Sequence, residues 1–152
     1  VAYRAAEVQT LLAGWGTFTL ETDPERCAAG WAHVRDVGPF QGRAGDVWRL
    51  SVTPTQAPAI VADLPGTEAL YDWGGGLIWL LVPDDGGGVA APEIHAAVAA
   101  RGGHAMRVRG DRSHAMFPPL SAPVAALQDG LRGKFDPRGI LNPGLMTPME
   151  TP

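Results

Sequence analysis

The sequence contains little of what marks several common classes of protein. Its 152 residues include one cysteine, Cys27, which excludes an internal disulfide and any zinc or iron–sulfur site built from cysteines. The 12 basic residues are outnumbered by 16 acidic ones, whereas nucleic-acid binding needs a basic surface, so no nucleic-acid partner is predicted. The longest apolar run, residues 77–82, is far shorter than a membrane helix, so no transmembrane segment is predicted.

The motifs of a complete active site are also missing. The 4 histidines, at positions 33, 95, 104 and 114, are not spaced as metal-binding pairs, so no metal site is predicted. The glycine runs at residues 74–76 and 86–88 lack the spacing and the strand–helix context of a phosphate-binding loop. No nucleophile elbow is present either. The sequence therefore predicts no self-contained active site.

The residues that are present predict an α+β domain. Residues 46–53 alternate with period two, and residues 69–73 and 77–82 are two strands joined by a glycine turn. A helix over 91–101, a strand over 103–109 and a helix over 121–135 follow, and helices over 5–12 and 24–34 precede. This order predicts a ferredoxin-like antiparallel sheet with helices packed on one face.

The start of the chain has an unusual appearance. Residues 1–4 have the composition of the end of a strand, which would lead directly into the first helix, and there is no initiator Met. We therefore expect the sequence to be a piece of a longer chain.

Arg49 is the first candidate for chemistry, because it lies in the middle of an otherwise apolar strand. Such an arginine needs an anionic partner, and a carboxylate bound through two hydrogen bonds is the natural one. The partner would be a substrate carboxylate, a structural pair with Asp72, or water at an edge strand. These alternatives stay open at this point.

Three other side chains are candidates for the same site. Trp73 and Trp79 flank the glycine turn, where they would line a binding wall or belong to the core. His104 shares its predicted strand face with Met106 and Val108, which favours a core or interface histidine. The alternative is a general base for an alcohol proton, a role that His114 would also fit.

Two further arginines of the same strand, Arg107 and Arg109, lie on the opposite predicted face from His104. We expect them to be solvated or to contact another subunit.

The end of the chain contains two rigid turns. Asp136-Pro137-Arg138-Gly139 and Asn142-Pro143-Gly144 combine a capping side chain, a fixed proline φ and a glycine. Ile140 and Leu141 lie between the turns as two apolar anchors. This pattern predicts a shaped loop, although a tail lying on the surface is the alternative.

The segment Lys134-Phe-Asp-Pro-Arg-Gly-Ile-Leu-Asn-Pro-Gly144 resembles the ending of the FAD-linked oxidases of the vanillyl-alcohol oxidase type. Within them, the chain resembles the smaller FAD-binding subunit of bacterial glycolate oxidases. The segments Trp48-Arg-Leu-Ser-Val-Thr-Pro54, Leu64-Pro-Gly-Thr-Glu-Ala-Leu-Tyr-Asp-Trp-Gly-Gly75, Gly102-Gly-His-Ala-Met106 and Phe117-Pro-Pro-Leu120 add to this resemblance, in the same order. It covers residues 46–146 well and the first forty residues poorly.

The resemblance implies that residues 1–135 form a cap or substrate domain and that residues 136–152 return toward an FAD domain outside this sequence. FAD would be bound mainly by that domain, with Asn142, Pro143 and Gly144 near the cofactor. The substrate would be a small 2-hydroxy acid, with glycolate oxidised to glyoxylate. The partners would be a larger flavin subunit and an iron–sulfur subunit, in the cytoplasm or at the inner face of the inner membrane.

The sequence departs in one respect from the related larger subunit and from the D-2-hydroxy-acid dehydrogenases that this larger subunit resembles, because it lacks the histidine-rich metal site of their cap. That absence puts independent oxidation of a 2-hydroxy acid by this subunit in doubt. Two other interpretations therefore stay open: a ferredoxin-like module that binds a small molecule, and a scaffold for assembly without its own catalysis.

Overall fold

The structure is a computed structural model, and it describes residues 2–84, 88–110 and 116–142. The chain divides into two compact units, Val1–Pro39 and Phe40–Pro152. The predicted boundary between a domain over 1–135 and a tail over 136–152 stays a prediction.

The first unit contains two helices with little core. They are α1 (Ala2–Leu12), continued by the short turn η1 (Ala13–Trp15), and α2 (Pro24–Arg35), and neither α-helix contains a buried residue. The prediction for α2 is confirmed at its start, where the Asp23 carboxylate accepts a hydrogen bond from Arg26 N at 2.8 Å. The predicted strand end before residue 5 is wrong. The alanines and long unbranched side chains of this segment favour a helix, which already includes Ala2.

The second unit contains a four-stranded antiparallel sheet with the order β2-β3-β1-β4. Its elements are β1 (Asp46–Ser51), α3 (Ala57–Ala62), β2 (Glu68–Asp72), β3 (Leu77–Val82), α4 (Ala91–Ala99) and β4 (His104–Arg109). Short 3-10 turns lie at Gly38–Phe40 (η2), Pro54–Gln56 (η3) and Trp73–Gly75 (η4). The ferredoxin-like α+β fold predicted from the sequence is confirmed.

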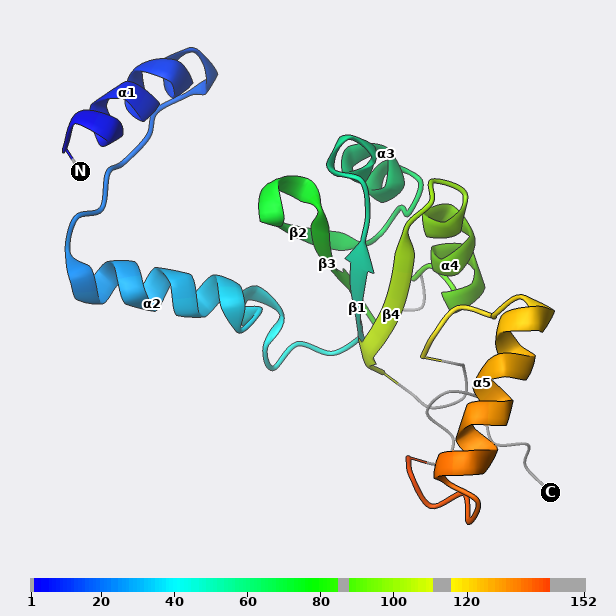
Figure 1. Cartoon of the computed structure of the whole chain (residues 1–152). Coiled ribbons are helices and arrows are strands. Elements are labelled where there is room, and N and C mark those ends of the chain that lie inside the picture. Colours follow the sequence, from blue (N-terminus) through cyan, green and yellow to red (C-terminus); the bar gives the residue numbers. More distant parts are fainter. Residues whose placement is uncertain (1, 85–87, 111–115, 143–152) are drawn as a thin grey trace. The chain divides into compact units, whose positions relative to one another are not determined.

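The hydrophobic core lies between one face of the sheet and the helices α3 and α4 (Figure 1). Trp48 and Leu50 of β1 and Ile78 and Leu80 of β3 are at most 1% exposed. Ile60 from α3, together with Ile94 and Val98 from α4, covers them. The alternation of β1 was predicted correctly, since Trp48 and Leu50 are buried and Arg49 is half-buried.

His104 and Met106 share one face of β4 and Arg107 lies on the other, as predicted, but the buried face was predicted wrongly. Ala105 and Arg107 face the core and are buried, whereas His104 and Val108 are exposed. Arg107 is tolerated there because its guanidinium Nη1 lies 3.1 Å from the Asp46 carboxylate. Arg107 therefore does not belong to a solvated surface, and the core interpretation of His104 is also wrong.

The last helix, α5 (Ala122–Phe135), contains no buried residue. Its apolar side chains recur every three or four positions, which places them along one stripe of the helix. This α5 stripe consists of Val124, Leu127, Leu131 and Phe135, all of which are exposed. No helix in the described part of the chain is long and apolar enough to cross a membrane.

Candidate functional site

The sheet face opposite α3 and α4, here called the second face, carries the candidate residues of the strands. Arg49 of β1 lies at its centre, directly opposite Trp79 of β3 on one side and Met106 of β4 on the other. Ser51, which follows Arg49 by two residues in β1, pairs with His104 of β4. Since cross-strand partners point to the same face of a sheet, the register brings Arg49, Trp79 and His104 onto one surface.

The second face is apolar around Arg49. Val47, Leu77 and Leu81 share this face by the strand register, and each is at most 7% exposed. Trp79 and Met106 are half-buried. A cation set among such side chains is partly removed from water, which strengthens its attraction for an anion.

Arg49 makes no ion pair with any described residue. The Asp72 carboxylate, its predicted structural partner, instead accepts a hydrogen bond from Trp73 N at 2.7 Å and caps the hairpin turn. Arg49 Nη1 donates only a long bond of 3.3 Å to Ser51 Oγ. The prediction of a pair with Asp72 is therefore wrong, and no other described carboxylate takes its place.

Trp73 lies over this arginine. The Arg49 Cζ atom is 5.3 Å from the centre of the Trp73 ring, within the range of a cation–π contact. Trp73 is 64% exposed, so the alternative that it is a core aromatic is wrong. The structure thus brings Arg49 together with Trp73 and Trp79, and it places His104 at the next cross-strand pair of the same face.

The first of the two predicted turns, at residues 136–139, forms a shaped loop with the residues that follow it, up to Leu141. The Asp136 carboxylate accepts hydrogen bonds from Ile140 N and Leu141 N, both at 2.9 Å, and Arg132 Nη2 donates to Leu141 O at 2.7 Å. The bond from Leu141 N, followed by that from Ile140 N, holds the pKa of Asp136 below its usual value. Ile140 and Leu141 are 63% and 58% exposed, so within the described residues they do not anchor the loop.

Only part of the predicted cofactor-contacting turn falls in the described region. Asn142 is exposed and has a φ of 45°, a left-handed conformation that asparagine tolerates. Pro143 and Gly144 lie outside the described residues, as does His114. Among the residues described, no group of three or more His, Cys, Asp or Glu side chains is arranged to hold a metal ion.

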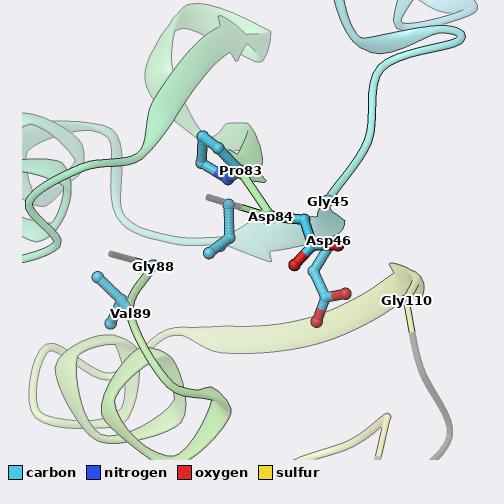
Figure 2. A pocket seen from close by; sticks show the side chains of 8 residues that line it. Gly45, Asp46, Pro83, Asp84, Gly88, Val89 and Gly110 are labelled. Carbon is cyan, nitrogen blue, oxygen red and sulfur yellow. The ribbon is translucent and has the colours of Figure 1, made fainter. Parts of the chain in front are cut away.

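A pocket that the sequence did not predict lies at the end of the sheet away from the Trp73 turn (Figure 2), where β1 begins and β3 and β4 end. Its volume is about 530 Å³. It is lined by Gly45, Asp46, Val82, Pro83, Asp84, Gly88, Val89 and Gly110. Among the described residues that line it, the charged side chains are the carboxylates of Asp46 and Asp84, and Asp46 is already paired with Arg107. An acidic lining does not suit a carboxylate ligand, so the second face remains the better candidate for an acid.

The Asp46–Arg107 pair was missed because nothing in the local sequence indicates it. The two residues are 61 positions apart, and only the antiparallel pairing of β1 with β4 joins them. A β-bulge between Val47 and Trp48 also shifts the register there.

Comparison with known proteins identifies one informative relative. No model of a known protein family matches the chain, and no solved structure does. The chain is 40% identical over 118 residues to the glycolate oxidase subunit GlcE of Escherichia coli (strain K12). The match covers 76% of this chain but 30% of that subunit, so the chain spans less than a third of its relative. The resemblance to a glycolate oxidase subunit that the sequence motifs predicted is thereby confirmed.

Proposed function

We propose that this chain is the cap portion of an FAD-dependent subunit in a glycolate-oxidase-like complex, and that its second face binds the carboxylate of a small 2-hydroxy acid such as glycolate. One observation carries the proposal. Arg49 is a half-buried cation on an apolar sheet face, and no described carboxylate pairs with it. The similarity to a glycolate oxidase subunit supports the choice of an acid as the missing anion.

The side chains of this face suit the task. A guanidinium binds a carboxylate through two parallel hydrogen bonds, which fixes the orientation of the acid as well as its affinity. Trp73 and Trp79 flank Arg49 and reduce the access of water to the ion pair. His104 is exposed on the same face, where a neutral imidazole would accept the hydroxyl proton of the acid.

FAD, when bound, would supply the acceptor for the hydride that leaves the carbon bearing the hydroxyl group. The described residues fit only a small part of this cofactor. Asn142 is exposed at the end of the loop fixed by Asp136, and its amide both donates and accepts, as a flavin ring edge requires. The sequence contains no glycine-rich phosphate cradle, so the proposal assigns most of FAD to a domain outside this sequence.

Further parts of the proposal rest on the family resemblance. Residues 1–135 would act as the cap domain and residues 136–152 as the tail that returns toward the FAD domain, bringing Pro143 and Gly144 near the cofactor. A larger flavin subunit and an iron–sulfur subunit would be the partners, and the complex would lie in the cytoplasm or peripherally at the inner membrane.

The test is substitution of Arg49 in the full-length subunit assembled with its partners. Arg49→Ala should raise KM for glycolate about 10- to 100-fold, since it removes hydrogen bonds between charged groups. The KM of Arg49→Lys should lie between that of the unchanged complex and that of Arg49→Ala, because lysine keeps the charge but cannot form the two parallel hydrogen bonds. Steady-state kinetics with glycolate measure both variants.

The matched control is Arg35→Ala, which removes an exposed arginine paired with its neighbour Asp36. Its KM and kcat should equal those of the unchanged complex. If Arg49→Ala also leaves both constants unchanged, the second face does not bind the substrate.

A docking role without catalysis is the second candidate. The α5 stripe favours it, because Leu127 and Phe135 are 66% and 80% exposed. Under this alternative, Leu127→Glu would abolish assembly with the partner subunits while Arg49→Ala would leave glycolate turnover intact. Co-purification and kinetics of the two variants separate the candidates.

A further inference from the structure

Trp73 adopts a backbone conformation that large residues rarely occupy. Its φ is 53°, and the next two residues, Gly74 and Gly75, have φ values of 61° and 97°. Glycine takes positive φ at little cost, whereas a bulky side chain there is strained. Strained residues of this kind persist only where their surroundings fix them, and they gather at binding sites. The turn thus contains a tryptophan at a position where glycine would adopt the same backbone conformation with less strain.

The surroundings of Trp73 do fix the turn. Trp73 N donates to the Asp72 carboxylate at 2.7 Å, and Gly76 N donates to Trp73 O at 3.2 Å. Val52 N donates to Gly76 O at 3.0 Å, which ties the turn to the end of β1. A Cβ atom on Gly75 would lie 3.3 Å from Pro54 O, so the backbone also packs closely against this segment. The indole therefore rests on a backbone with little freedom to move.

The Arg49 guanidinium lies over the ring of the Trp73 indole, with its Cζ atom 5.3 Å from the ring centre. A carboxylate binds in the plane of a guanidinium, along its N–H edge. The rest of a bound acid then extends beside the indole. A longer or branched substituent at the carbon next to the carboxylate would meet the ring, and the fixed turn would resist its displacement.

We propose that Trp73 is a specificity-determining residue that admits short 2-hydroxy acids to Arg49 and excludes longer or branched ones. This inference rests on the proposed function of the second face. It assigns to Trp73 the selection of the acid, a role separate from the binding of its carboxylate.

The experiment compares glycolate with 2-hydroxybutanoate in the full-length subunit assembled with its partners. Trp73→Gly removes the ring and suits the positive φ, so the variant should fold. The ratio of kcat/KM for 2-hydroxybutanoate to kcat/KM for glycolate should rise at least about tenfold, the scale by which hydrophobic sites discriminate methylene groups. Trp73→Asn, which also tolerates a left-handed backbone, should give the same rise.

Tyr71→Ala is the matched control. It removes an aromatic ring from the same hairpin, 44% exposed, but Tyr71 pairs with the core residue Ile78 and so belongs to the opposite sheet face. The ratio of kcat/KM for 2-hydroxybutanoate to kcat/KM for glycolate in this variant should stay within about twofold of the ratio in the unchanged complex. Only a change in discrimination on the second face would alter it.

The outcomes separate this inference from the proposed function. An unchanged ratio in both Trp73 variants, with glycolate turnover lost in Arg49→Ala, overturns the inference and leaves the site intact. An Arg49→Ala variant with normal kinetics removes the site itself. Loss of turnover with both acids in the Trp73 variants would show that Trp73 only holds Arg49 in place, which also overturns the selection role.

Discussion

Two arginines on neighbouring strands show how the environment of a side chain separates structure from function. Arg107 of β4 faces the core, where its guanidinium lies 3.1 Å from the Asp46 carboxylate and 5.9 Å from the centre of the Trp48 ring. Arg49 of β1 faces the second face and has an aromatic neighbour but no described acid. Because a half-buried cation is stabilised by an anion, Arg49 is the arginine with a place for a ligand.

The Asp46–Arg107 pair should contribute strongly to stability. The Arg107 side chain is 4% exposed, so removal of the Asp46 carboxylate takes an anion away from beside a buried positive charge. Asp46→Ala should therefore lower the free energy of unfolding by about 3 kcal/mol. Urea denaturation followed by far-UV circular dichroism measures the change.

Glu68→Ala is the control for this prediction. It breaks an exposed pair with Arg43, whose side chain is 42% exposed, so water replaces the lost partner and the loss should be smaller. An equal loss of unfolding free energy in the two variants would mean that the buried Asp46–Arg107 pair contributes no more to stability than an exposed pair.

At the same scale, the sequence contained the signal for Arg49 but not that for Arg107. An arginine between Trp48 and Leu50 in an alternating strand is conspicuous, and its location on the face away from the core follows from the period of two. Arg107 lies in a strand whose alternation has no clear apolar side, and its partner is 61 residues away. Long-range pairing of this kind leaves no trace in the local sequence.

At the scale of elements, local chemistry predicted the strands, the hairpin and most helices. Asp23-Pro24 begins α2 and the glycine triplet follows β2, as capping and turn preferences require. The buried face of β4 was predicted wrongly because both of its faces contain polar and apolar residues. Only the contact of β4 with β1 and α4 determines which face is buried.

The stability of the loop after α5 should depend on pH through the carboxyl group of Asp136. The hydrogen bonds from Leu141 N and Ile140 N lower the pKa of the folded carboxyl below its unfolded value of about 4. A group with a depressed folded pKa stabilises the folded loop above the unfolded pKa, and this contribution is lost as the pH falls through the folded value. The loop should therefore be protected at neutral pH and should open only in strong acid.

Hydrogen exchange of the Ile140 and Leu141 amides, corrected for intrinsic rates, measures this opening. Protection should be steady from neutral pH down to about pH 4 and should fall below it. Asp136→Asn should remove the pH dependence and much of the protection at neutral pH. Protection of these amides that rises toward low pH would contradict the assignment.

At the scale of the whole chain, the core lies entirely in the second unit. Every member of the main hydrophobic cluster belongs to residues 48–105, whereas α1 and α2 contain no buried residue. Trp15 and Trp31 of the first unit are 86% and 74% exposed. The two units therefore differ sharply in how much apolar burial stabilises them, although one continuous chain contains both.

This difference predicts that residues 1–39 can be removed without loss of the sheet. The shortened chain keeps Phe40, which is 4% exposed, and the Arg109 hydrogen bonds to Phe40 O and Arg43 O. Because surface segments without buried side chains add little to stability, the free energy of unfolding of the sheet should change by less than about 0.5 kcal/mol. The denaturant dependence of that transition should also be unchanged, since the same apolar area becomes exposed.

Tryptophan fluorescence makes the measurement direct. Trp48, which is 1% exposed, reports on the core, and Trp73 and Trp79 belong to the same unit, whereas the deletion removes Trp15 and Trp31 of the first unit. A urea titration of both chains should give the same midpoint for the transition of the sheet. A clearly lower midpoint in the shortened chain would mean that the first unit supports the sheet through contacts beyond its own helices, and the two units would then fold as one.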